Sequence, residues 1–318
     1  MIVALGLLAG AAAAAWVIPR GLGAADTRWW DPVVLIVCWL LSMLGVVVAA
    51  VTGVALLLTP THGVLGTMLI AAHDCLDSLQ HGAVPSAEET GGVLGVVVLL
   101  ALGTRLAVVG VRGMRGRSRV RRRHLSALRI AGRQDATSPT TLWLAHDRPL
   151  AFSMAGNPGL VVATDGLTRH LDPAGVAAVL AHERAHLNGR HHQLVSSVSA
   201  LRTVLAFLPL FERAPAAIRE LVELAADVSA VRRHGVSAVR TALLGVSGSG
   251  VPDTGLAMGR DAVDVRLERL DYGTPVPMGP RRVLSCAAAG LTAAVLPLAT
   301  GATMLFAFGS IVCVAAGF

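Results

Sequence analysis

The residues best suited to chemistry lie in the run Ala181-His182-Glu183-Arg184-Ala185-His186, an H-E-x-x-H pattern. On a helix, His182 and His186 project from one face one turn apart, so both imidazoles can bind one Zn²⁺. Glu183 is rotated by about 100° from His182, so its carboxylate can act on metal-bound water instead. The pattern also arises by chance as a solvated His/Glu pair, so its surroundings decide its meaning.

A second motif offers the third ligand that a catalytic zinc site needs, since such sites usually keep three protein ligands and one water. Glu223 lies 37 residues after His186 and one helical turn before Asp227. We expect Glu223 to complete a His₂Glu site and Asp227 to hold a ligating imidazole in its tautomer. Glu220 is the rival ligand, although we interpret it as a surface residue near Arg219.

Capping and turn signals predict the elements that position these residues. Asp172 can cap a helix that starts at Pro173, and Gly189 can end it, which places the first motif in mid-helix. Further helices are predicted at 193–211, 215–233 and 260–270. Short apolar-rich segments separated by turn residues predict a small antiparallel sheet of about three strands, at 141–146, 150–155 and 160–164.

The composition indicates an integral membrane protein. Hydrophobic residues make up 54% of the 318 residues and charged residues 15%, against about 25% charged residues in typical soluble domains. The mean hydropathy is +0.64. These values exclude a disordered chain, and four cysteines exclude a disulfide-stapled secreted module.

Apolar stretches long enough to span a bilayer predict four to five transmembrane helices, because a span needs about 20 residues. They lie at about 1–18, 33–58, 92–111 and 283–318. The last stretch is too long for one span, so we expect one helix with an embedded tail or a short hairpin. The chain thus divides into a transmembrane region at 1–112, a polar domain at 113–282 and a terminal membrane segment.

The distribution of arginine predicts the orientation. All 27 basic residues are arginine, and ten of them fall between Arg105 and Arg133, whereas the loop at 59–91 has none. Positive charge favours the cytoplasmic side, so we expect that loop and the N-terminus outside and the polar domain inside. We interpret the cluster as an anchor for anionic lipid and expect no nucleic acid binding. A transporter is least favoured, because the spans lack carboxylates.

Four runs of sequence carry a resemblance to a known group: Pro149-Leu-Ala-Phe-Ser153, Gly159-Leu-Val-Val-Ala-Thr-Asp-Gly-Leu167, Val179-Leu-Ala-His-Glu-Arg-Ala-His186 and Glu223-x-x-x-Asp227. They resemble the membrane-embedded gluzincins. Two branches are similar: the antirepressor metallopeptidases, which include the beta-lactam sensor-transducers, and the heat-shock and prenyl-protein endopeptidases. The helical arrangement and the charged neighbourhood of His191 and His192 look closer to the antirepressor branch. The sequence shows no extracellular penicillin-binding domain before Phe318, so beta-lactam sensing is not implied.

The resemblance implies an α-rich membrane protein with a cytoplasmic α+β zincin domain that holds one Zn²⁺ per chain. It implies zinc ligation by His182, His186 and Glu223 and a catalytic base at Glu183. It also implies that one strand receives the substrate backbone, through Ala151, Phe152, Ser153 and Met154. Tyr272 and Arg266 are candidates to stabilise an oxyanion, but we interpret both as structural, and we expect His191 and His192 to be exposed.

The function expected from these residues is hydrolysis of peptide bonds in a cytosolic or membrane-proximal protein, in regulated proteolysis or signalling. The resemblance implies a protein substrate, with a cytosolic transcriptional repressor as one candidate partner. The first alternative is a quality-control protease for membrane proteins. The second is a signalling protein with structural zinc, although such a site would be closed by four protein ligands and three are evident.

The orientation can be tested by cysteine labelling in intact cells. An impermeant maleimide should reach native Cys75 in the loop at 59–91, whereas a cysteine introduced as Ser138→Cys should react only after lysis. The reason is the asymmetry in arginine between the two segments. Labelling in the reverse order would overturn the orientation.

Overall fold

The computed structural model describes residues 2–25, 27, 30–58, 87–135, 138–246 and 263–272, with single positions at 284, 288, 291, 295 and 299. Most of the predicted outer loop, including Cys75, lies outside the described residues, as does most of the terminal segment 283–318. The predicted domain boundaries and orientation therefore stay predictions.

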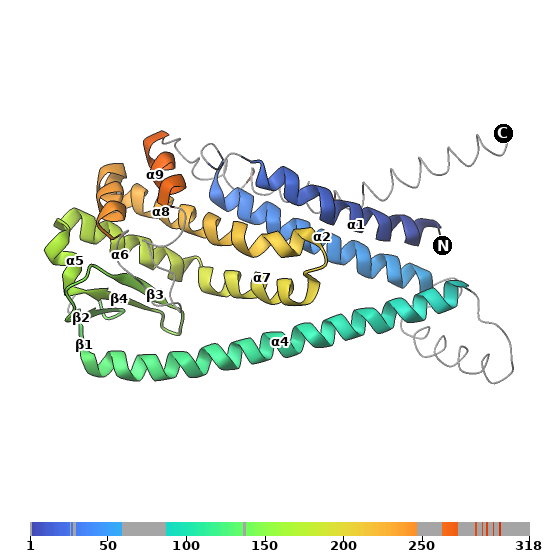
Figure 1. The fold of residues 1–318 in the computed structure, drawn as a ribbon, viewed down its shortest axis with the longest axis horizontal. Coiled ribbons are helices and arrows are strands. Elements are labelled where there is room, and N and C mark those ends of the chain that lie inside the picture. Colours follow the sequence, from blue (N-terminus) through green and yellow to red (C-terminus); the bar gives the residue numbers. More distant parts are fainter. Residues whose placement is uncertain are drawn as a thin grey trace.

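Three described helices are long and apolar enough to cross a membrane: α1 (Ile2–Gly23), α2 (Pro32–Leu58) and α4 (Ala87–Ala131). They include residues 2–18 of the first predicted span and all of the predicted spans at 33–58 and 92–111. Helices α1 and α2 lie side by side, whereas α4 runs obliquely from the end of α2 to the sheet (Figure 1). The number of spans in the whole chain stays a prediction.

Helix α4 is longer than the sequence predicts. It continues past residue 111 through the arginine cluster to Ala131 without a break. Arginine, alanine and leucine are good helix formers, and the stretch contains no proline, so nothing ends the helix where the apolar residues stop. The arginines of α4 whose side chains are described are exposed: Arg105, Arg112, Arg115, Arg117 and Arg119.

The sheet corrects the prediction of about three antiparallel strands. It has four strands in the order β1-β2-β4-β3, and β2 pairs parallel to β4. The strands are β1 (Gly132–Gln134), β2 (Thr141–Leu144), β3 (Ala151–Met154) and β4 (Leu160–Thr164). The chain passes from β2 to the outer position of β3 and returns through a tight turn to β4, which inserts beside β2. Segments of three to five residues carry little information about pairing partners, so the sequence did not show this order.

Five further helices are described, and α6 begins and ends where the predicted caps place it. They are α5 (Asp165–His170), α6 (Pro173–Asn188), α7 (His191–Leu205), α8 (Pro209–Val246) and α9 (Val263–Tyr272). The Asp172 side chain accepts a hydrogen bond from the Gly175 amide at 2.7 Å, which confirms the predicted start of α6. Helix α8 is longer than predicted and breaks at Gly235, whose φ of 82° suits glycine.

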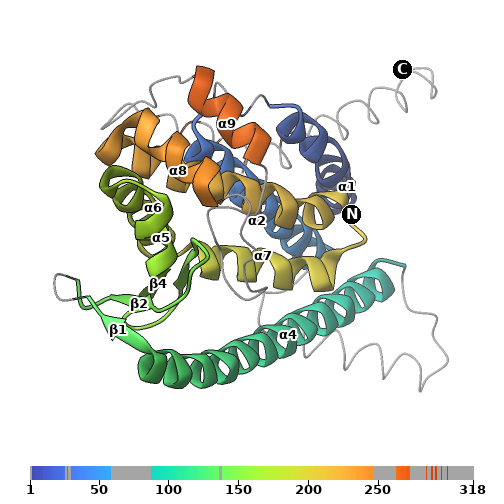
Figure 2. The ribbon, with the colours of Figure 1, turned by 60° about the vertical axis from the view of Figure 1, so that its left-hand side comes forward.

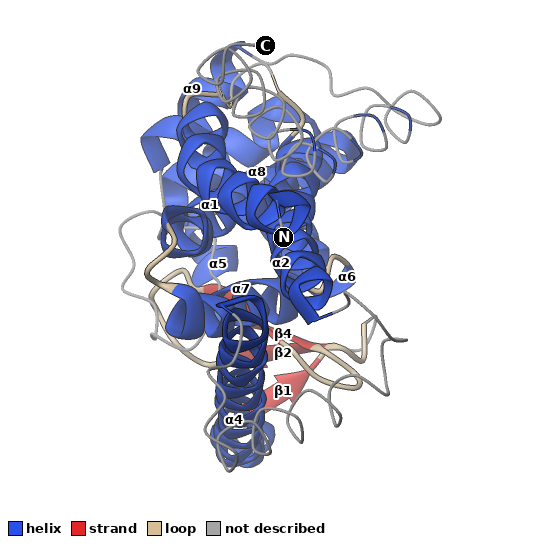
Figure 3. Ribbon diagram, turned by 90° about the vertical axis from the view of Figure 1, so that its right-hand side faces the viewer, coloured by secondary structure: helices blue, strands red, loops and turns tan. Residues whose placement is uncertain are grey.

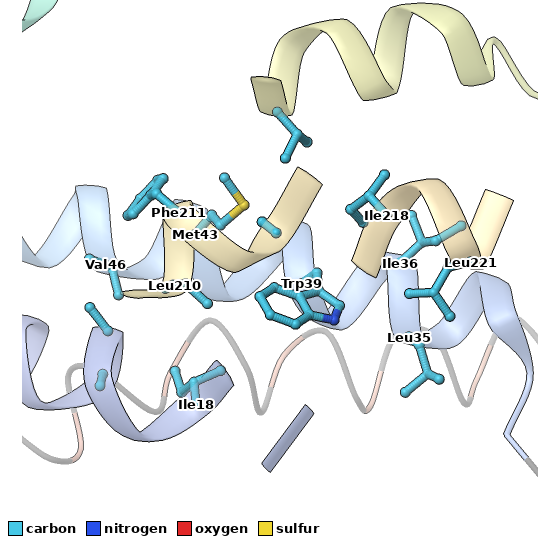
Figure 4. Packing of buried hydrophobic residues seen from close by; sticks show 14 of the residues in the cluster. Ile18, Leu35, Ile36, Trp39, Met43, Val46, Leu210, Phe211, Ile218 and Leu221 are labelled. Carbon is cyan, nitrogen blue, oxygen red and sulfur yellow. The ribbon is translucent and has the colours of Figure 1, made fainter. Parts of the chain in front are cut away.

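Two apolar cores meet along α8. Its first half packs with α1, α2 and α7, and Figure 4 shows Phe211 near Met43 and Ile218 near Ile36. Its second half, from Ala230 on, joins a core with α6, the sheet and α9. Figure 2 shows α9 lying across α8, and Figure 3 shows α7 between α4 and the other long helices. The second sequence motif sits on α8 between these two cores.

Candidate metal centre

Helices α6 and α8 bring three predicted ligands together inside the protein. The Nε2 atoms of His182 and His186 lie 3.1 Å apart. Glu223 Oε2 lies 3.3 Å from His182 Nε2, and Glu223 Oε1 lies 3.4 Å from His186 Nε2. All three side chains are buried, and among the described residues they form the group that could hold a metal ion.

The distances between these atoms fit a tetrahedral zinc site. Zinc bonds to nitrogen and carboxylate oxygen are about 2.0–2.2 Å long, so neighbouring ligand atoms in a tetrahedron lie about 3.3 Å apart. The observed separations of 3.1, 3.3 and 3.4 Å agree with that value. Two imidazoles and one carboxylate are also ligands that zinc accepts readily. The donor set and its spacing therefore fit zinc.

Asp227 holds the first histidine from the side opposite the cluster. Its Oδ1 lies 2.9 Å from His182 Nδ1, which leaves Nε2 directed at Glu223. Burial disfavours a charged His182, but hydrogen bonds to Asp227 and Glu223 outweigh burial and raise the pKa of His182 to about 9. The carboxylates thus favour a positive charge at this histidine, and a bound cation can replace the proton.

Arg266 on α9 is a central residue whose role the sequence did not reveal. It is completely buried and donates two hydrogen bonds of 2.7 Å to Asp227, from Nε and Nη2. Its Nη1 lies 3.4 Å from Glu223 Oε2. Burial would raise the pKa of Asp227, but Arg266 and His182 lower it to about 2. Arg266 therefore keeps Asp227 ionised and oriented.

One signal in the sequence could have indicated this role. Arg266 lies three residues after Val263 and four before Leu270, within the apolar stripe of a short amphipathic helix. A charge in such a stripe needs a buried partner. Tyr272, the other oxyanion candidate, is 62% exposed at the end of α9 and outside the cluster.

The second histidine is held by His191, which the sequence predicted to be exposed. That prediction is wrong: His191 is 8% exposed, and its Nδ1 lies 3.0 Å from His186 Nδ1. Arg190 adopts a left-handed conformation with φ 51°, which lets α7 start at once and turns its first residue back onto α6. Gly189 permits this approach, because a Cβ there would lie 2.3 Å from the His191 ring. Burial lowers the pKa of His191 to about 4.

The general-base candidate and the predicted substrate strand lie beside this cluster. Glu183 is completely buried on α6, and α6 packs against β3. Strand β3 pairs only with β4 in the described sheet, so it is an edge strand. Ser153 in β3 is buried, with its Oγ 3.1 Å from His192 Nε2 at the start of α7. His192 is half-buried, so its predicted exposure is also wrong.

The rival third ligand does not join the cluster. Glu220 is half-buried on α8, and burial raises the pKa of its carboxyl group. The metal-binding group among the described residues includes Glu223 and not Glu220. Glu220 lies one turn before Glu223 on α8 but outside the described cluster.

Comparisons with known proteins agree with this geometry. Residues 117–246 match the sequence profile of Peptidase family M48. The chain is 31% identical over 87 residues to a "Protease HtpX homolog" of Moorella thermoacetica, covering 27% of this chain and 29% of that protein. It is 29% identical over 125 residues to "Protease HtpX homolog 1" of Streptomyces coelicolor, covering 36% and 41%. No solved structure matches the chain significantly.

The matched stretch contains all of α6 and α8, and thus every residue of the His-His-Glu cluster. This stretch is similar to the M48 metallopeptidases, which are zinc-dependent, and supports the heat-shock branch of the two resemblances. The closer resemblance to the antirepressor branch is not confirmed. The chain spans 29% and 41% of the length of these two relatives, so the activity of the whole protein is a proposal.

The orienting role of Asp227 predicts a specific loss on substitution. Asp227→Asn keeps the size of the side chain but removes the charge that His182 and Arg266 share. Zinc affinity should fall by about 10- to 100-fold, as is typical when the partner of a ligating histidine is lost. Competition with a chromogenic chelator measures this, with Glu220→Gln on the same helix as the control. Equal affinity in wild type and Asp227→Asn would contradict the assigned role.

Proposed function

We propose that the protein is an integral-membrane, zinc-dependent endopeptidase. The observation that carries this proposal is the convergence of three buried ligand atoms at the spacing of a tetrahedral zinc site, next to a buried glutamate. The similarity of residues 117–246 to Peptidase family M48 supports the same activity. The three apolar helices support a location in a membrane.

In this proposal His182, His186 and Glu223 bind one zinc ion per chain, and Asp227 and Arg266 orient them. Zinc in such a site supplies Lewis acidity, which acidifies water and polarises a carbonyl group. Glu183 accepts a proton from the attacking water on a carboxylate oxygen. It then delivers that proton to the nitrogen of the leaving amine.

Strand β3 is the proposed docking site for substrate. An edge strand can align an extended peptide through main-chain hydrogen bonds, and such bonds read little sequence. Helix α6 packs against β3, so a peptide added there would pass close to Glu183. The positions with this role are Ala151, Phe152, Ser153 and Met154. Ser153 and Ala151 face the core, so the side chains of Phe152 and Met154 are the more available pair.

The cellular role follows from this mode of binding. Recognition through the main chain favours a protease that accepts many unfolded segments, which supports quality control of membrane proteins. Regulated cleavage of one signalling protein, with a transcriptional repressor among the candidate partners, is the narrower alternative. In both roles we propose that the catalytic domain faces the cytoplasm and that the N-terminus lies outside. The reason is that arginine is concentrated next to the catalytic domain, and positive charge favours the cytoplasmic side. The two roles can be distinguished by comparing the cleavage products in cells that carry active or inactive enzyme. Many cleaved proteins would support quality control, and one cleaved protein would support regulated cleavage.

A non-catalytic protein with structural zinc is the remaining alternative. Structural zinc sites are closed by four protein ligands, whereas catalytic sites keep one position open. Among the described residues the cluster offers three ligands. The donor count therefore favours catalysis.

The proposal predicts that Glu183→Gln separates metal binding from turnover. The amide cannot take the proton from water, so hydrolysis of a quenched peptide or unfolded protein should fall by about 10²- to 10⁴-fold. Zinc content should stay near one per chain, because Glu183 is not a ligand. Glu220→Gln is the matched control and should retain activity. Full activity in Glu183→Gln, with zinc bound, would exclude this residue as the base.

A further inference from the structure

Helices α7 and α8 form a cavity of about 290 Å³ that is open to solvent and separate from the metal centre. Its lining consists of small, hydroxyl and basic residues: Ser199, Arg202, Thr203, Ala206, Pro215 and Arg219. None of these residues belongs to the His-His-Glu cluster. The proposed peptidase chemistry does not use this cavity.

The charges of the cavity favour an anion. Arg202 and Arg219 approach it from two helices, and none of its lining residues is acidic. The hydroxyl groups donate to carbonyl oxygens of their own helix, Ser199 to Val195 at 2.7 Å and Thr203 to Ser199 at 3.0 Å. The guanidinium groups are therefore the donors left to face the cavity. A pair of guanidinium groups matches the oxygens of a phosphate group well.

The cavity lies level with the end of the first candidate span. Leu8 of α1 lies against Gly53 of α2, so twelve residues further along α1 Arg20 is level with about Leu41. Arg20 lies 5.6 Å from the ring of Trp16, and such Arg and Trp residues are typical of the headgroup level.

Helix α8 fixes the height of the cavity along α2. Phe211 lies near Met43 and Ile218 near Ile36, as Figure 4 shows. Two residues of α8 line the cavity: Pro215 lies between these two contacts, and Arg219 directly follows Ile218. Positions 215 and 219 therefore lie about 3 Å and about 9 Å past the level of Arg20, close to where the first candidate span ends at Gly23.

The turn between α7 and α8 lies beyond the cavity and is entirely apolar. The run from Val204 to Phe211 contains eight apolar residues. Leu210 and Phe211 are buried in the core, whereas Phe207 is 66% exposed and forms the apolar tip of the turn. Its level beside Met43 places it deeper along α2 than the two arginines. Glu212 and Arg213 follow directly and are exposed, which limits insertion to the turn. The basic cavity suits the anionic headgroup of a lipid, and the apolar turn, which lies deeper along α2, suits its acyl chains.

We propose that this cavity binds the phosphate of an anionic phospholipid, with the acyl chains along the apolar turn between α7 and α8. Arg202 and Arg219 bind the headgroup, and Phe207 contacts the chains. Because α7 begins at His191 and α8 carries Glu223, an occupied cavity also steadies the two helices that complete the metal centre.

Native mass spectrometry of the purified full-length protein tests this. Wild type should retain phosphatidylglycerol in preference to phosphatidylcholine of the same acyl chains. Arg202→Gln with Arg219→Gln should reduce phosphatidylglycerol retention by about tenfold or more, because two charge-assisted contacts are lost. The matched control is Arg232→Gln with Arg233→Gln, an equal change of charge at exposed positions further along α8, which should retain the lipid.

Three results would overturn the proposal. Equal retention of both lipids by wild type would exclude a site for anionic headgroups, and this arm needs no variant. Equal losses in both double variants would show attraction by net charge alone. Thermal stabilisation of wild type by inorganic phosphate as large as that by phosphatidylglycerol would assign the cavity to free phosphate. Zinc content of the variants reports whether they fold.

Discussion

Burial of three carboxylates at one place is the constraint on which this structure depends. Glu183, Glu223 and Asp227 are each at most 3% exposed, and an isolated buried charge would destabilise the fold severely. Arg266 and the charge favoured at His182 offset two of these three negative charges. Helix α9 must therefore dock on α8, since loss of the arginine would leave a buried carboxylate without its strongest partner. The same balance aims the imidazole nitrogens at one point, so stability and metal binding rest on one set of contacts.

The position of the second motif couples the metal centre to the apolar helices. The part of α8 that packs against α1 and α2 ends next to Glu223. The part from Ala230 on packs against α6 and the sheet. A displacement of α8 relative to α2 would move one ligand away from the two on α6. His191 adds a second link, because it joins the start of α7 to His186. The membrane helices thus support the site directly, and their packing can influence its geometry.

Local signals in the sequence predicted the site better than its surroundings. The spacing of the two motifs and the cap at Asp172 depend on one helix at a time, so α6 has the predicted bounds. The strand order, the contact of His191 with His186 and the ion pair of Arg266 depend on residues far apart in the chain or on a left-handed turn at Arg190. Helical periodicity carries no information about such contacts, although the place of Arg266 in an apolar stripe is a signal that could have predicted its buried partner.

X-ray absorption at the zinc edge, on the full-length protein with its zinc content measured, tests the central claim most directly. The account predicts one zinc per chain with two imidazoles and a carboxylate, all at about 2.0–2.2 Å, plus one exchangeable oxygen. Glu223→Ala should lose zinc, while Glu220→Ala keeps it. A sulfur shell near about 2.3 Å, four protein ligands, or full zinc in Glu223→Ala would contradict the account.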